Sequence, residues 1–284
     1  MKIIDQNALR DPVANQLRTY LVSGGNVLIS DVAFSEMTKH PTMWHETFKQ
    51  STRILSEYPD QVYIARTTGW IYGEELVHGK SSLKWLDKCI SKESTVAFRQ
   101  HLSEIEIENS DFTLKLQKNV RNAQKLADDN YFHGAFNPKY LKNLTSWWKN
   151  RLSKESSKRL RSADDVWECM HDVLIESDIE FIVYTELRGV DANEVQAVAL
   201  IKNKSLIYYL IITMYAYALK WLAIGGIEFA KDKTLQNELA DADYVALSLL
   251  FDGIISNETD VNSMLKMLCK IFITLEKNDR LTKA

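Results

Sequence analysis

Acidic residues directly follow two short apolar runs near opposite ends of the chain. The run NVLIS is followed by Asp31 and, five residues later, by Glu36, and the run GIIS is followed by Glu258 and Asp260. A carboxylate at the end of a buried strand loses hydration that only a partner, a proton or a metal ion can replace. These acids are therefore candidates for chemistry.

Asp241 and Asp243 stand at the start of the helix predicted to lead into the GIIS run. The carboxyl ends of parallel strands meet at one edge of a sheet, and a right-handed crossover can bring this helix start to the same edge. Carboxylates gathered there would repel one another without a cation, and oxygen ligands without His or Cys favour Mg²⁺ or Mn²⁺. The matching chemistry is phosphodiester hydrolysis by a metal-bound water.

Ordinary helix capping is the alternative explanation for these acids. Asp241 before ADYVAL and Asp260 before VNSML have the positions of N-terminal caps. Glu74, Glu75 and Glu186 follow strand-like runs and could complete the site, but we expect them to be solvated acids of helices or loops. No HExxH metal motif, GxSxG elbow or GxxxxGK[ST] phosphate loop is present in the sequence.

The elements that position these acids alternate between strand and helix at the two ends of the chain, which predicts a parallel α/β sheet flanked by helices. Predicted strands occupy residues 26–30, 61–65, 179–186, 253–256 and 271–275. Predicted helices occupy residues 6–22, 43–58, 205–219, 243–251 and 260–268, and residues 67–79 form a short helix or a loop. The polar stretch between residues 80 and 178 lacks strand signals. We expect residues 1–80 and 179–284 to form two halves of one α/β core, with residues 81–178 as a large all-helical insertion.

The stretches VLISDVAFSE and DADYVALSLLFDGIISNETDV resemble those of the PIN-like nucleases. By that resemblance Asp31 matches the acid after the first strand, Asp241 or Asp243 the helix-start acid, Glu258 the acid after the later strand, and Glu36 a second acid of longer members. The chain departs from the usual Thr-x-Asp ending, because Ser256 replaces Thr and Glu258 replaces Asp. Asp260 is the alternative ligand there.

The resemblance implies a PIN-like fold and a nuclease that uses Mg²⁺ or Mn²⁺, with RNA a more usual substrate than DNA. A role as a bacterial toxin or defence effector follows by analogy alone. The rival interpretation is a non-enzymatic helical module that docks a protein partner.

Residues 146–162 carry a basic stripe behind two tryptophans. The cations recur at three- and four-residue steps, which would place them on one face of a helix. Such a face could bind a phosphate backbone while a tryptophan stacks on an unpaired base, and the alternative is a solvated face with core tryptophans. The predicted nucleic-acid contacts are Trp147, Trp148, Arg151, Lys154, Lys158 and Arg161.

The composition fits a reduced cytoplasmic protein with a substantial core. The 284 residues are 45% hydrophobic, and a net charge of -3 limits any polyanion contact to a local patch. Three widely spaced cysteines form no zinc motif, and the N-terminus lacks the long apolar core of a signal peptide. The apolar run at residues 205–219 is shorter than the roughly 20 residues of a membrane span, so we expect a buried helix that could also serve a protein partner or a homo-oligomer.

Overall fold

The computed structural model describes residues 1–10, 15–38, 43–104, 114–115, 118 and 137–281. Its four strands form one parallel sheet in the order β3-β2-β1-β4. The strands are β1 (Lys2–Ile4), β2 (Val27–Ile29), β3 (Val62–Ile64) and β4 (Ile254–Ile255). Ile3 of β1 lies beside Leu28 on one side and Ile254 on the other, so the two ends of the chain share one sheet.

This sheet confirms the predicted α/β fold and three of the predicted strands, at residues 26–30, 61–65 and 253–256. It also adds a strand that the sequence analysis missed. β1 has only three residues, of which Ile3 and Ile4 are fully buried in the centre of the sheet. Asp5 follows it directly, so the first acid at this sheet edge is Asp5.

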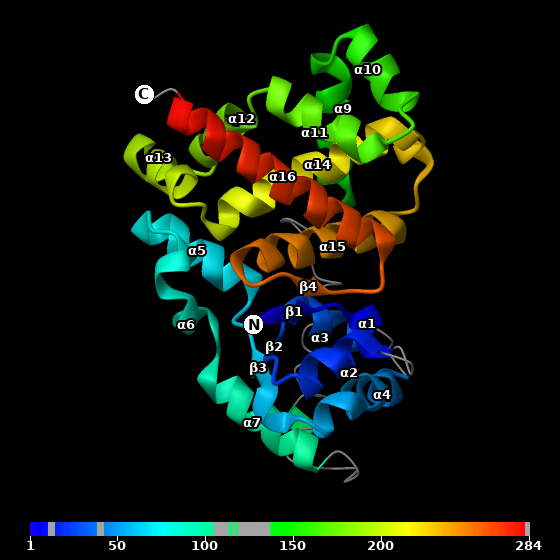
Figure 1. Cartoon of the computed structure of the whole chain (residues 1–284), viewed down its shortest axis with the longest axis vertical. Helices are drawn as coiled ribbons and strands as arrows, with labels where there is room; N and C mark the ends of the chain where they lie inside the picture. Colours follow the sequence, from blue (N-terminus) through cyan, green and yellow to red (C-terminus); the bar gives the residue numbers. More distant parts are fainter. Residues whose placement is uncertain (11–14, 39–42, 105–113, 116–117, 119–136, 282–284) are drawn as a thin grey trace.

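Short helices from the N-terminal part of the chain lie around the sheet, except the one at residues 68–78, which packs against helices of the C-terminal part (Figure 1). They are α1 (Gln6–Arg10), α2 (Asn15–Val22), α3 (Asp31–Thr38), α4 (Trp44–Ser56), α5 (Thr68–His78), α6 (Leu86–Cys89) and α7 (Lys92–Ser103), with 3-10 turns η1 (Pro59–Gln61) and η2 (Ser82–Trp85). The predicted helix at residues 6–22 is thus divided into α1 and α2, and its residues 11–14 lie outside the described part of the chain. On the other side, α15 (Asp232–Leu250) packs against β1 and β4.

A helical body sits on the far side of α15 from the sheet (Figure 1). It contains α9 (Pro138–Arg151), α10 (Lys154–Arg161), α11 (Val166–Glu176), α12 (Ile179–Gly189), α13 (Glu194–Lys202), α14 (Leu206–Ile224), the 3-10 turn η3 (Ile227–Phe229) and α16 (Thr259–Leu281). Helices therefore continue well past residue 178. Of the predicted insertion, residues 105–113, 116–117 and 119–136 lie outside the described part.

Helix α14 is the centre of this body and confirms the predicted buried apolar helix. Within the described residues it alone has the length and apolar character of a membrane span, and 83% of that window is buried inside the protein. It packs against α9, α10, α11 and α15. Its first turn is held by Glu75, whose carboxylate accepts hydrogen bonds from the backbone N–H groups of Leu206 and Ile207 at 2.8 and 3.0 Å.

Two predicted strands are wrong, because residues 179–186 and 271–275 belong to α12 and α16. Their β-branched and aromatic residues favour strands locally, but the positions that become buried recur at helical spacing. In α12 these positions are Ile179, Ile182, Val183 and Leu187. Burial against the neighbouring helices thus overrides the local preference.

Candidate metal centre

The candidate site lies at the carboxyl ends of β1 and β4. From β1 the chain continues to β2 and then β3 on one side, whereas β4 adds to the opposite side of β1. The sheet order therefore reverses between β1 and β4, which is where open α/β sheets bind ligands. Asp5 follows β1 at this point, and Ser256 and Glu258 follow β4.

Asp5 is anchored from both strands. Its side chain is almost fully buried, its Oδ2 accepts a 2.6 Å hydrogen bond from the Ser256 hydroxyl, and its Oδ1 accepts one from the Asn7 backbone at 3.2 Å. Burial nevertheless raises the pKa of Asp5, against the opposing effect of these hydrogen bonds. The Asn7 side-chain amide also donates to Glu258, so one short segment after β1 orients acids on both strands.

Helix α15 and helix α3 complete the group. Burial raises the pKa of Asp241 to about 9, and the negative charges of Glu258, Glu238, Asp5 and Glu36 add to this rise. Glu36 accepts a 2.9 Å hydrogen bond from the Tyr244 hydroxyl, one turn beyond Asp241 on α15. We call Asp5, Glu36, Asp241 and Glu258 the four-acid cluster.

Glu258 is subject to the same mutual repulsion. Its pKa is raised first by burial and then by the charges of Asp5 and Glu36. Each member of the cluster that shows a raised pKa would be stabilised as an anion by a nearby cation. All the donors are carboxylate oxygens, which is the ligand type that Mg²⁺ and Mn²⁺ prefer.

Lys220 of α14 forms ion pairs with two acids that lie beside this cluster. Its buried ammonium lies 3.0 Å from Glu238 Oε1 and 2.8 Å from Asp260 Oδ2. Asp260, predicted as an alternative metal ligand, is therefore ion-paired in this structure. It also occupies the first turn of α16, where a carboxylate is favoured by the helix dipole, as the capping alternative supposed.

A tyrosine hydroxyl next to the cluster has no hydrogen-bond partner among the described residues. Tyr217 is fully buried, and its pKa is raised first by burial and then by the charges of Asp241 and Glu238. Buried polar groups are normally hydrogen-bonded, so this unpaired hydroxyl is an exception that lies beside several acids.

Asp31 and Asp243 form a separate pair. The Asp31 carboxylate accepts a hydrogen bond from the Thr68 backbone N–H at 3.3 Å and another from the Thr68 hydroxyl at 3.2 Å. Asp243 is almost fully buried, and its pKa is raised well above the ordinary value by burial and by the charge of Asp31. The predicted group of acids is thus divided, and Asp31, expected at the centre, has Thr68 and Asp243 as its neighbours.

The position of Asp241 and Asp243 along their helix also corrects the prediction. They were expected at the start of a helix, but α15 begins at Asp232, so both lie in its interior. Asp241 is therefore not an N-terminal cap. Its burial has no capping explanation, which strengthens its assignment to the four-acid cluster.

The basic stripe is divided between two helices, because α9 ends at Arg151 and α10 begins at Lys154. Trp148 is fully buried and its indole N–H donates to the Tyr215 carbonyl at 2.9 Å, so the prediction that it stacks on a base is wrong. Trp147 packs edge-on against Tyr215, under the guanidinium of Arg151. Trp148 is thus a core tryptophan, as the alternative supposed, and Trp147 is half-buried against the core, while the stripe's Arg151, Lys154, Lys158 and Arg161 are exposed.

Among the described residues, the group whose possible ligand atoms already lie within 4.8 Å of one another is a different one, Glu168, His171 and Asp172 on α11 at the surface. Lys270 lies 2.7 Å from the Glu168 carboxylate and already neutralises it. This group therefore has less need of a cation than the four-acid cluster.

Comparison with known family models, with curated proteins and with solved structures finds no match to this chain.

The raised pKa of Asp241 predicts a pH-dependent stability of the metal-free protein. Between about pH 4 and pH 9 the folded state keeps a proton on Asp241 that the unfolded state, with a pKa near 3.8, has lost. Stability therefore falls as pH rises through this window. Asp241→Asn should reduce that fall and raise the melting temperature at pH 8 in EDTA by about 3–6 °C. Thermal unfolding at pH 5 and pH 8 measures this pH dependence, and the exposed Asp87→Asn serves as the control. If the parent and Asp241→Asn showed the same pH dependence of stability, the prediction would be contradicted.

Proposed function

We propose that the chain is a divalent-metal-dependent nuclease whose ligands are Asp5, Glu36, Asp241 and Glu258. The observation that carries this proposal is the mutual repulsion within the four-acid cluster between β1 and β4, where the pKa values of Asp5, Asp241 and Glu258 are raised and a cation would lower them. When bound, Mg²⁺ or Mn²⁺ lowers the pKa of a water nucleophile and offsets charge on the phosphate.

The chain's own residues hold this site in place. Ser256 and Asn7 orient Asp5, Asn7 also orients Glu258, and Tyr244 orients Glu36. Asp241 loses its proton as a cation binds, so cation binding and proton release are coupled. Lys220 keeps Glu238 and Asp260 paired at the rim, which limits the negative charge that the substrate phosphate meets.

Cleavage of end-labelled single-stranded RNA, single-stranded DNA and duplex DNA tests this proposal. We expect hydrolysis with Mn²⁺ or Mg²⁺ and none in EDTA. Glu258→Gln should lower the rate about 100-fold or more, since it removes a charged ligand worth several kcal/mol, whereas exposed Asp87→Asn should match the parent. Equal cleavage by parent and Glu258→Gln would reject the assignment. RNA preference and a toxin or defence role stay predictions from the resemblance.

The basic stripe should contribute mainly to affinity. Replacing Lys154, Lys158 and Arg161 with Glu should weaken binding of a labelled oligonucleotide and flatten its salt dependence, because each phosphate contact releases counterions. Fluorescence anisotropy across a salt titration measures both effects. Binding and slope equal to those of the parent would assign these residues to a solvated face.

The rival interpretation, a module that docks a partner through the apolar helix at residues 205–219, finds less support. Most side chains of α14, from Leu206 to Leu222, are already buried against the chain's own helices. The helix therefore offers little free surface for a protein partner or for a second copy of the chain.

A further inference from the structure

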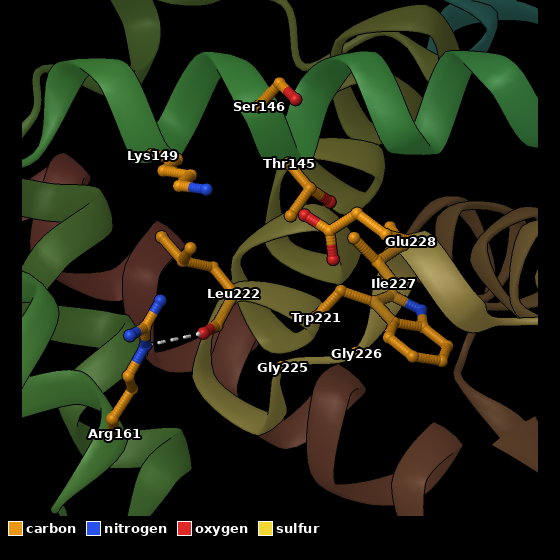
Figure 2. Close-up of a pocket in the computed structure, with 10 residues that line it drawn as sticks. All are labelled: Thr145, Ser146, Lys149, Arg161, Trp221, Leu222, Gly225, Gly226, Ile227 and Glu228. Atoms are coloured by element: carbon orange, nitrogen blue, oxygen red, sulfur yellow. Dashed lines mark hydrogen bonds between the residues drawn. The ribbon is translucent and has the colours of Figure 1, made fainter.

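A polar pocket lies where α9, α10 and the end of α14 meet (Figure 2). Its volume is about 190 Å³, enough for a group the size of a phosphate. Trp221 and Leu222 form part of its wall, and they directly follow Lys220 in the sequence. The pocket thus shares α14 with Lys220, whose own side chain is paired with Glu238 and Asp260.

Two cations from different helices line this pocket. Lys149 comes from the last turn of α9 and Arg161 from the last turn of α10, and Figure 2 shows both on the same side of the cavity. The Arg161 guanidinium is held by a 3.4 Å hydrogen bond to the Leu222 carbonyl. Glu228 enters from the opposite wall, which leaves an excess of positive charge. An anion with several oxygens fits this arrangement.

The residue that follows the pocket lining in sequence is an exposed aromatic residue. Phe229, the residue after Glu228, is 92% exposed. The preceding glycines, Gly225 and Gly226, have positive φ values of 75° and 81° and turn the chain sharply, while Ile227 is buried and anchors the turn. The turn thus presents Phe229 to solvent from a fixed base, and such a ring is a platform for an unpaired nucleobase.

We propose that this pocket is a single-stranded nucleic-acid subsite, in which Lys149 and Arg161 bind a backbone phosphate and Phe229 stacks on an adjoining base. The inference rests on the proposed nuclease function and adds the strand type of its substrate, a single strand with unpaired bases. A duplex would keep its bases stacked internally and would leave Phe229 unused.

An anionic membrane is the competing ligand for a surface with cations and an exposed ring. Ile224 is also exposed, at 59%, but charged residues surround these two apolar side chains. This apolar area is small compared with the continuous apolar face of an interfacial helix.

Fluorescence anisotropy in EDTA, where metal-dependent cleavage cannot occur, tests the subsite with labelled U15, dT15 and a 15-base-pair DNA duplex. We expect Phe229→Leu to weaken single-strand binding about 10-fold and Phe229→Trp to retain it, because Leu keeps apolar area but loses the stacking face. Lys149→Gln should weaken binding and reduce the salt slope by about 0.7. Thermal unfolding checks that each variant is folded.

Unchanged single-strand affinity in Phe229→Leu and Lys149→Gln, or no binding by the parent at low salt, would overturn the subsite. So would a loss of binding to phosphatidylserine vesicles in these variants while oligonucleotide binding stays constant. The proposed function fails by a different result: an absence of Mn²⁺-dependent cleavage by the parent. Binding that depends on Phe229 without any cleavage would reject the nuclease and keep the binding site.

Discussion

Asp5→Asn should lower metal-dependent cleavage at least 100-fold while leaving the chain folded. The carboxylate stands at the carboxyl end of the central strand, and its oxygens are fixed by Ser256 and Asn7. Asn keeps the size of the side chain but removes the charge that would anchor a divalent cation, at a cost of several kcal/mol in transition-state stabilisation. Single-turnover cleavage of labelled RNA with Mn²⁺, together with circular dichroism, measures both parts of this result.

Asp31→Asn is the matched comparison, because Asp31 also follows a strand and was expected from the sequence to be a metal ligand. Its carboxylate contacts Thr68, and its charge acts on Asp243. We expect this variant to retain more activity than Asp5→Asn. If Asp31→Asn abolished cleavage and Asp5→Asn had no effect, the original assignment from the sequence would be right and the four-acid cluster would lose its role.

Glu75→Ala should destabilise the protein by about 3–5 kcal/mol, the largest stability effect that we expect from one side chain. Glu75 is fully buried and accepts hydrogen bonds from Ser82, Leu206 and Ile207. Truncation leaves these backbone donors buried without a partner and removes an anion from the N-terminus of α14. Equilibrium urea unfolding gives the free energy directly.

Glu74→Ala provides the control for Glu75. Glu74 is the preceding residue, and its side chain is 38% exposed with an ion pair to His78 on the same helix. Such surface pairs contribute little, so the variant should stay within about 0.5 kcal/mol of the parent. Equal stability losses for Glu74→Ala and Glu75→Ala would show that the buried hydrogen bonds do not support α14.

The strands at residues 26–30, 61–65 and 253–256 could be predicted because each is an apolar run bounded by Gly, Pro or polar residues. β1 was missed because it is only three residues long and depends on its neighbours: Ile3 pairs with β2 and with β4, far away in sequence. Asp5 was missed with it. The available signal was the acid directly after two isoleucines, the same pattern that drew attention to Asp31.

Side-chain partners distant in sequence account for the other differences at the site. Nothing near Asp260 in the sequence indicates Lys220, and nothing near Asp31 indicates that Thr68 would hold it. The basic stripe was treated as one helix, but Leu152 and Ser153 interrupt it, with Ser153 capping α10. The role of Trp148 could not be read from its own segment, because the residue becomes buried through contact with the apolar α14, where its indole N–H donates a hydrogen bond to the Tyr215 carbonyl.

Calorimetric titration of Mn²⁺ into the full chain at pH 7.5, in two buffers of different ionisation enthalpy, tests the central claim most directly. The four-acid cluster predicts saturable binding with release of about one proton, because Asp241 is protonated before the cation arrives. Asp241→Asn should bind more weakly and release fewer protons, while exposed Asp87→Asn should match the parent. An absence of saturable binding, or binding and proton release unchanged in both Asp5→Asn and Asp241→Asn, would contradict the account.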